Sequence, residues 1–312
     1  MVKSPVLFET YTRIETARVV WEHIIAAKPA KLYFYSNKAL ESRHEDVKRN
    51  NEIRSWVKEV NWPCELHTFF RDEQVDQYTS LLSSKKWLFE NEERGIILED
   101  DCVPSVAFFQ FCDYFLDYYE NQKKILCISG NNYISYKPKA EEDHILSRKG
   151  SLYGWATWRD RFESVDFNTD PSNITLSAFL KNFKGIGVHG YVQYFMYQDL
   201  RGFLKKTHCW DMIWNMTCLQ TNRLYVNPVR NLVRNIGVVG EHASGNTNDI
   251  VFEKNVDFNK EYSFKGFSPQ IEPNNDYDKR FYPERFPVQK LLVASLKNRI
   301  RALFGYKWYN SK

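Results

Sequence analysis

Three carboxylates stand in a row in this sequence, as Glu99, Asp100 and Asp101, directly after the apolar run at 96–98. Adjacent acidic side chains repel one another unless a positive charge lies among them. Mg²⁺ and Mn²⁺ suit such a place, because these ions prefer oxygen ligands and commonly combine one or two protein carboxylates with phosphate oxygens. The alternative is structural: Asp100 or Asp101 would cap the helix expected to begin near Pro104.

The elements that would position these acids follow from the pattern of the first 130 residues. We expect strands at 5–10, 31–36, 64–70, 95–99 and 125–130, and helices at 13–28, 44–60, 77–92 and 105–120. Strands and helices that alternate at these intervals predict a largely parallel sheet covered on both faces. Ligands of such sheets bind just beyond the carboxyl ends of the strands, where the acidic triplet would lie.

The remainder of the chain has a different texture. It contains a polar loop at 131–150, an aromatic stretch at 151–162, helical patterns near 189–205 and 209–221, strand and loop over 223–246, a segment rich in Asn, Asp, Pro and Lys at 247–286, and a basic amphipathic pattern at 287–312. We therefore expect one domain over 1–246, divided into halves at 1–130 and 131–246. An extended segment (247–286) and a C-terminal helix (287–312) would follow.

Composition narrows the class of protein. The 312 residues are 43% hydrophobic, enough to bury a sizeable core, and the net charge of +4 without a long basic block argues against nucleic acid as a partner. Six cysteines without a CxxC pair, and no apolar run of signal or membrane-spanning length, predict a soluble, cytoplasmic protein. The basic helix at 287–312 would lie on the inner face of the membrane or dock on protein.

Four motifs occur in order along residues 5–245: the acidic segment "GIILEDDCVPS", then "LYGWATWRDRF", "CWDMIWNMTCLQTNRLYVNP" and "NLVRNIG". Together they resemble a bacterial group of nucleotide-sugar glycosyltransferases of the GT-A fold, distantly similar to the inverting N-acetylglucosaminyltransferase with an EDD motif. The resemblance implies a Rossmann-like α/β fold with a mixed, mostly parallel sheet. It makes 1–246 a catalytic domain, with a nucleotide-binding half at 1–130 and an acceptor-binding half at 131–246. It also implies an enzyme that uses Mn²⁺ or Mg²⁺ to move a sugar from a nucleoside-diphosphate sugar, with UDP favoured, to a glycan or lipid-linked glycan.

Carried over residue by residue, the resemblance implies a donor site around the acidic triplet. Asp101 would bind the metal that bridges the donor diphosphate, while Glu99 and Asp100 would hold the ribose, the sugar or metal-bound water. A metal there would neutralise the leaving diphosphate as the glycosidic bond breaks. Arg13 and Arg71, each placed after a predicted strand, would contact the nucleotide.

Three positions depart from the family pattern. Asn37 stands where relatives often carry an Asp that binds uracil, and because an amide both donates and accepts, the identity of the base stays open. Asp76 lies where a glycine-containing segment is common. His242 of "GEHASG" is displaced by a few positions from the family's metal-proximal histidine, so it is a candidate metal ligand, with an ordinary surface residue as the alternative.

The acceptor side would be formed around Asp211. This residue matches the family's catalytic base, which takes the proton of the acceptor hydroxyl, and Trp210 would exclude water beside it and contact the acceptor. The alternative for Asp211 is a helix N-cap. Trp155 and Trp158 match an aromatic loop beside the sugar site, with Trp155 the candidate acceptor contact, and core packing is the alternative for both.

Two other functions compete with glycosyl transfer. Nucleotidyl transfer would also place a diphosphate and a metal on a doubly wound sheet, but the segment after the first strand, "ETYTRIETAR", lacks the expected glycine-rich loop. A catalytically degenerate protein that binds glycans or acts as a scaffold is the second, and the three departures keep it open.

Overall fold

The computed structural model describes residues 2–132, 134, 136, 142–170, 174–184, 186–204, 209–237, 258, 260–262, 264, 271–285, 289 and 292–293, of which 199–204 and 285 are described by their backbone alone. The chain divides into two compact units. The first, here called the sheet unit, comprises Met1–Asn168 and Cys209–Pro273, and the second, here called the helical unit, comprises Thr169–His208 and Asn274–Lys312. These boundaries differ from the expected ones at 130 and 246, because 169–208 packs with residues that follow 273.

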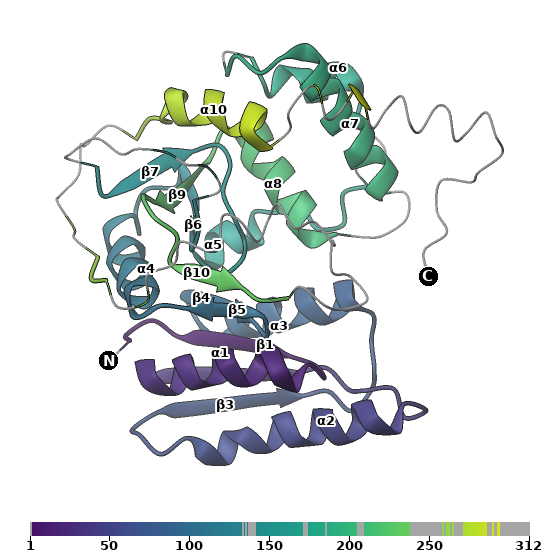
Figure 1. Ribbon diagram of the computed structural model, residues 1–312, viewed down its shortest axis with the longest axis vertical. Coiled ribbons are helices and arrows are strands. Elements are labelled where there is room, and N and C mark those ends of the chain that lie inside the picture. Colours follow the sequence, from purple (N-terminus) through teal and green to yellow (C-terminus); the bar gives the residue numbers. More distant parts are fainter. Residues whose placement is uncertain are drawn as a thin grey trace. The chain divides into compact units, whose positions relative to one another are not determined.

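The sheet unit is built on an eight-stranded sheet with the order β3-β2-β1-β4-β8-β6-β9-β7 (Figure 1). The strands are β1 Val6–Thr10, β2 Lys31–Ser36, β3 Glu65–Phe70, β4 Arg94–Glu99, β6 Ile125–Ser129, β7 His144–Ser147, β8 Trp155–Trp158 and β9 Leu224–Pro228. β8 runs antiparallel to β4 and β6, and β7 runs antiparallel to β9, whereas β1–β4 are mutually parallel and β6 is parallel to β9. The expected mixed, mostly parallel α/β sheet is confirmed.

Helices cover both faces of this sheet. They are α1 Ile14–Ala27, α2 His44–Ser55, α3 Gln77–Asn91, α4 Val106–Tyr118, α5 Arg159–Glu163 and α8 Trp210–Thr221, with a 3₁₀ helix at Trp56–Glu59. Successive strand residues point to opposite faces. Phe8 of β1 therefore packs in the core cluster that contains α1 and α4, whereas its neighbour Leu7 packs in the cluster that contains α3 and α8.

Two short strands bring the "NLVRNIG" segment to the acidic triplet. β5 (Cys102–Pro104) follows the triplet directly and pairs antiparallel with β10 (Val233–Asn235). The backbone N–H of Ile236 then donates to the carbonyl of Asp101 at 2.8 Å. Residues more than 130 positions apart in the sequence thus meet at the carboxyl end of β4.

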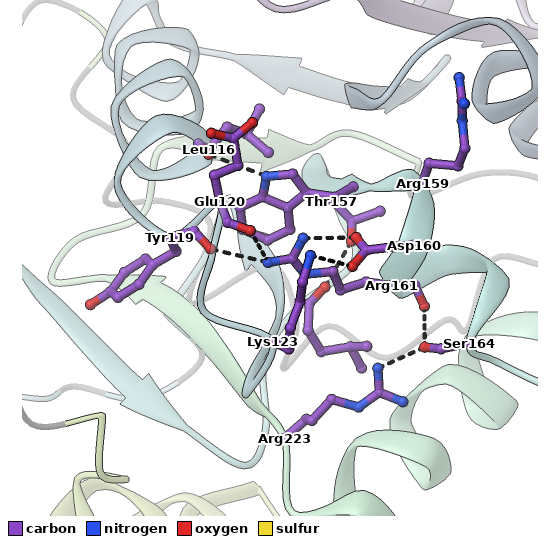
Figure 2. Close-up of polar contacts among 12 residues, drawn as sticks. Leu116, Tyr119, Glu120, Lys123, Thr157, Arg159, Asp160, Arg161, Ser164 and Arg223 are labelled. Atoms are coloured by element: carbon purple, nitrogen blue, oxygen red, sulfur yellow. Dashed lines mark hydrogen bonds and ion pairs between the residues drawn. The ribbon is translucent and has the colours of Figure 1, made fainter.

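The aromatic stretch at 151–162 contains β8 and all but the last residue of α5, and a buried arginine joins them to the turn after α4 (Figure 2). Arg161 donates to the carbonyls of Tyr119 at 3.1 Å and Glu120 at 2.5 Å, and it pairs with Asp160 at 2.7 Å. Both carbonyls belong to the turn that follows α4, and that of Tyr119 also accepts from the N–H of Gln122 at 2.9 Å. The Arg161 guanidinium thus ties α5 to this turn.

Two expectations about irregular segments are wrong. Within the expected polar loop at 131–150, His144–Ser147 forms β7, and within the expected extended segment at 247–286, Asn275–Arg285 forms α10. Helix α10 forms because Tyr277, Phe281 and Tyr282 bury one face of it in the helical unit. This unit also contains α6 (Leu176–Lys181) and α7 (Gly190–Leu204).

The expected C-terminal helix at 287–312 lies outside the described residues, apart from 289 and 292–293. No helix in the described part of the chain is both long and apolar enough to cross a membrane.

Candidate active site

The acidic triplet lies at the carboxyl end of β4, as the sequence predicts. Glu99 is the last residue of the strand and is half-buried, and only 5% of Asp100 and 8% of Asp101 is exposed. Neither aspartate caps the following helix. α4 begins at Val106, and its N-cap is Ser105, whose hydroxyl accepts from the N–H of Phe108 at 3.2 Å. The structural alternative for these acids, helix capping, is therefore wrong.

Arg13 supplies a positive charge to the two aspartates. It follows β1 and precedes α1, and its Nη1 lies 2.9 Å from Asp101 Oδ2 while Nη2 bonds Asp100 Oδ1. Its side chain is 37% exposed, so the guanidinium sits where the acids meet solvent. The structure thus brings together three of the residues implied by the family resemblance.

A second ion pair lies beside the triplet, and the sequence analysis missed it. Glu9 of β1 is in register with Glu99 of β4 and binds Lys85 of α3, whose Nζ is 2.7 and 2.9 Å from the two carboxylate oxygens. Both side chains are buried, Lys85 completely. The available signal was Glu9 itself, a charged residue inside the apolar strand "VLFET".

The site carries more negative than positive charge. Four carboxylates, those of Glu9 and the triplet, face the cations of Arg13 and Lys85. Burial raises the pKa of Glu99 to about 8, an effect that Lys85 opposes and the neighbouring carboxylates reinforce. Burial also raises the pKa of Asp100 to about 6, although Arg13 lowers it. Because both pKa values are raised in the folded protein, the free energy of unfolding falls as pH rises toward them and the two groups ionise. A further cation beside the carboxylates would reduce this loss of stability.

A metal ion at this site would need ligands from phosphate or water besides the carboxylates. Within the described residues no three His, Cys, Asp or Glu side chains are grouped to hold a metal ion. Mg²⁺ and Mn²⁺ sites with one or two carboxylates take their other ligands from phosphate and water. Asp101 suits that pattern, because the backbone at Gly237 forms a close cradle for its carboxylate: a Cβ there would lie 2.2 Å from Oδ2. His242, the other candidate ligand, lies outside the described residues.

This cradle gives a prediction. Replacing Gly237 with Ala places a methyl group against the Asp101 carboxylate, so we expect a loss of stability of about 1–3 kcal/mol. Thermal unfolding measures the loss. Gly190→Ala is the control, since a Cβ at Gly190 meets nothing within 4 Å. Equal behaviour of the two variants would contradict the cradle.

Asp211 is the second residue of α8 and not its N-cap, which is Cys209. The capping alternative is therefore wrong. Its Oδ1 accepts from the N–H of Met212 at 2.8 Å and from the Cys209 thiol. Burial and the neighbouring carboxylate raise the pKa of that thiol, so it stays protonated and donates. No described residue hydrogen-bonds Oδ2 of Asp211.

Trp210 connects the start of α8 to the acidic site. Its ring lies 4.3 Å from Nζ of Lys85, which pairs with Glu9 in register with Glu99. The Trp210 ring is also stacked on Trp155, with the two ring centroids 5.6 Å apart. The first turn of α8, which carries Asp211, is thus anchored beside the triplet through the Glu9–Lys85 pair.

The two tryptophans of "GWATW" lie in the core. Trp155 is buried and also contacts Trp214 edge-on at 4.9 Å, and Trp158 donates from Nε1 to the carbonyl of Leu116 at 3.2 Å. Neither ring offers an exposed face for a sugar in this structure. The acceptor-binding roles of Trp155 and Trp210 stay predictions, and core packing accounts for Trp158.

Asn37 and Arg71 lie at the ends of β2 and β3 and make local contacts. The Asn37 amide donates to the carbonyl of Val75 at 2.8 Å, and Arg71 Nη1 donates to Ser83 Oγ at 3.0 Å. Asp76 caps α3 by accepting from the N–H of Thr79 at 3.0 Å. The donor-binding roles of Asn37 and Arg71 stay predictions, whereas the departure at Asp76 has a structural reason.

Two cavities lie away from the triplet. One of about 450 Å³ is bordered by α3 and α5 in the sheet unit, and one of about 760 Å³ is bordered by α6 and α7 in the helical unit. Neither cavity is lined by a residue of the acidic site. The acidic triplet is therefore identified as a candidate site from its charge and hydrogen bonds, and not from a cavity.

The fold and this site define an α/β protein in which four carboxylates and two cations lie together at the carboxyl ends of parallel strands. No protein-family model and no curated protein matches the chain. Similar solved structures include the glycosyltransferase GlyE of Streptococcus pneumoniae (10% identity, TM-score 0.30, 53% of this chain and 36% of that chain). They also include an apo UDP-glucose pyrophosphorylase (10% identity, TM-score 0.31, 55% of this chain and 81% of that chain). A third is HddC of Yersinia pseudotuberculosis (11% identity, TM-score 0.29, 50% of this chain and 77% of that chain). Likeness this low assigns no activity.

Proposed function

We propose that the protein is an inverting, metal-dependent glycosyltransferase of the GT-A fold. Its donor would be a nucleoside-diphosphate sugar, with a UDP-sugar favoured, and its acceptor a glycan or lipid-linked glycan. The observation that carries this proposal is the pair of buried aspartates beyond β4, which cap no helix and share a single guanidinium. Contact of 287–312 with the inner face of the membrane is part of the proposal.

On the donor side, Asp101 would hold Mn²⁺ or Mg²⁺. The ion would supply neutralisation of the leaving diphosphate. The residues of the chain bind and orient: Gly237 holds the Asp101 carboxylate in place, and Arg13 provides a guanidinium that binds phosphate in two-pronged geometry. Glu99 and Asp100 face the same edge and would bind ribose or sugar hydroxyls.

On the acceptor side, Asp211 would be the base. Its Oδ1 is engaged by Met212 and Cys209, so Oδ2 is the oxygen that would receive the proton of the acceptor hydroxyl. The hydroxyl oxygen would form a bond to the anomeric carbon as the bond to the diphosphate breaks on the opposite face. Configuration at that carbon would invert.

The alternative is a catalytically degenerate protein that binds glycans or serves as a scaffold. The local contacts of Asn37 and the burial of Trp155 favour it, because both withdraw candidate ligand-binding groups. Release of nucleoside diphosphate separates the two functions. An enzyme hydrolyses its donor slowly with Mn²⁺ even without acceptor, and a scaffold does not.

A panel of donors tests the proposal. We expect at least one of UDP-, GDP- or dTDP-sugars to raise the melting temperature, and more so with Mn²⁺, because a ligand at 100 times its Kd stabilises the native state by about 2.7 kcal/mol. A CMP-sugar, which carries a single phosphate, should not. Differential scanning fluorimetry measures the midpoints. Asp101→Asn is the matched variant and should lose the Mn²⁺-dependent part. A panel in which no donor shifts the midpoint would refute the proposed function.

A further inference from the structure

We propose that Arg13 competes with a divalent metal ion for Asp100 and Asp101. In the ligand-free protein its guanidinium pairs with both aspartates, so the metal ion binds tightly only after a diphosphate has drawn the guanidinium away. This inference rests on the proposed function, because it assumes that Asp101 is the metal ligand. It adds an order of events, in which metal and nucleotide enter together.

The two oxygens of Asp101 have different surroundings. Oδ1 faces the thiol of the fully buried Cys102 at 3.4 Å. Oδ2 faces Arg13 Nη1 at 2.9 Å and lies against the backbone of Gly237. The oxygen away from the buried thiol is thus already bonded to a cation, and a metal ion at Oδ2 would lie within a few ångströms of the guanidinium. Two cations at that separation repel strongly.

Arg13 is able to leave, whereas the other cation of the site is not. Its backbone is fixed, since its carbonyl accepts from the N–H of Ala17 at 2.9 Å, but its side chain is 37% exposed. A phosphate offers the guanidinium the same two-pronged partner as the carboxylates, so the transfer conserves charge-assisted hydrogen bonds. Lys85 is completely buried and held by both oxygens of Glu9.

The consequence is a reciprocal coupling between metal and nucleotide. If the diphosphate raises the affinity for the ion by removing Arg13, the ion must raise the affinity for the diphosphate by the same factor. Such a protein would bind free Mn²⁺ weakly, and Arg13 would neutralise the two aspartates until the donor binds.

Binding of Mn²⁺ alone, followed by electron paramagnetic resonance of the free ion, tests the inference without any turnover. We expect Arg13→Gln to bind Mn²⁺ at least about tenfold more tightly than the wild type when no nucleotide is present. We expect UDP, GDP or dTDP to raise the Mn²⁺ affinity of the wild type at least about tenfold and that of Arg13→Gln much less. Arg18→Gln is the control, because Arg18 lies on α1, which Arg13 precedes, and pairs with Glu59 instead of the aspartates.

Arg13→Lys guards against misfolding of the glutamine variant, since it keeps one charge but cannot bridge both carboxylates, and it should bind Mn²⁺ with intermediate affinity. Equal Mn²⁺ affinity of the wild type and both Arg13 variants, lost in Asp101→Asn, would overturn the inference and leave the metal site standing. Absence of Mn²⁺ binding in every variant, with each nucleotide, would overturn the inference and the metal-dependent function together.

Discussion

Replacing Asp211 with Asn is expected to lower kcat for sugar transfer about 10²–10⁴-fold while donor affinity changes little. The amide keeps the shape of the carboxylate and still accepts from the N–H of Met212, but it cannot take a proton. The acceptor hydroxyl would then have to lose its proton to water. Under the proposed function Asp211 would act on the acceptor and Asp101 on the donor, so the Mn²⁺-dependent thermal shift with donor should survive in this variant.

Steady-state kinetics with varied donor and acceptor separate these effects. The control is Asp76→Asn, which makes the same change at the start of another helix, where Asp76 caps α3. That variant should keep its kcat and change little in stability, because Asn caps a helix about as well as Asp. A loss of less than about tenfold in Asp211→Asn would mean that another group accepts the proton, and the assignment of the base would fall.

The sequence predicts the parallel half of the fold because its signals are local. The strands at 5–10, 31–36, 64–70 and 95–99 are apolar runs between amphipathic helices, and each is found within a residue or two of its predicted place. β7 and β8 escape prediction because they have four residues each, too few for a pattern to repeat. Their pairing is decided by neighbouring strands that are distant in sequence.

In the acidic site, too, the features set by local sequence are predictable and those set by contacts between distant residues are not. Its position follows from the end of a strand, and the resemblance to a family supplies Arg13 as a nucleotide contact. The contact of Arg13 with Asp100 and Asp101 is not visible in the sequence, because it joins residues 87 and 88 positions apart. Glu9 and Lys85 are separated by 76 positions, and a lysine on a helix normally faces solvent.

The Glu9–Lys85 pair supports the second large prediction. Replacing Lys85 with Met fills a similar volume but leaves the Glu9 carboxylate buried without its cation. We expect a loss of about 3–5 kcal/mol in the free energy of unfolding, because removing one partner of a buried ion pair leaves an uncompensated charge. The cation over the Trp210 ring is lost as well, so the start of α8 loses an anchor. Denaturant unfolding followed by tryptophan fluorescence measures the loss.

A double-mutant cycle distinguishes the lost pair from lost packing. Glu9→Gln combined with Lys85→Met removes both charges of the pair, so the double variant should be more stable than the sum of the single effects predicts, by about 1–3 kcal/mol. Lys86→Met is the matched control, since Lys86 is the exposed neighbour on the same helix and its replacement should change stability by less than about 0.5 kcal/mol. Additive single effects would show that Lys85 acts through its hydrocarbon chain, and the anchor of α8 beside the acidic triplet would then depend on packing alone.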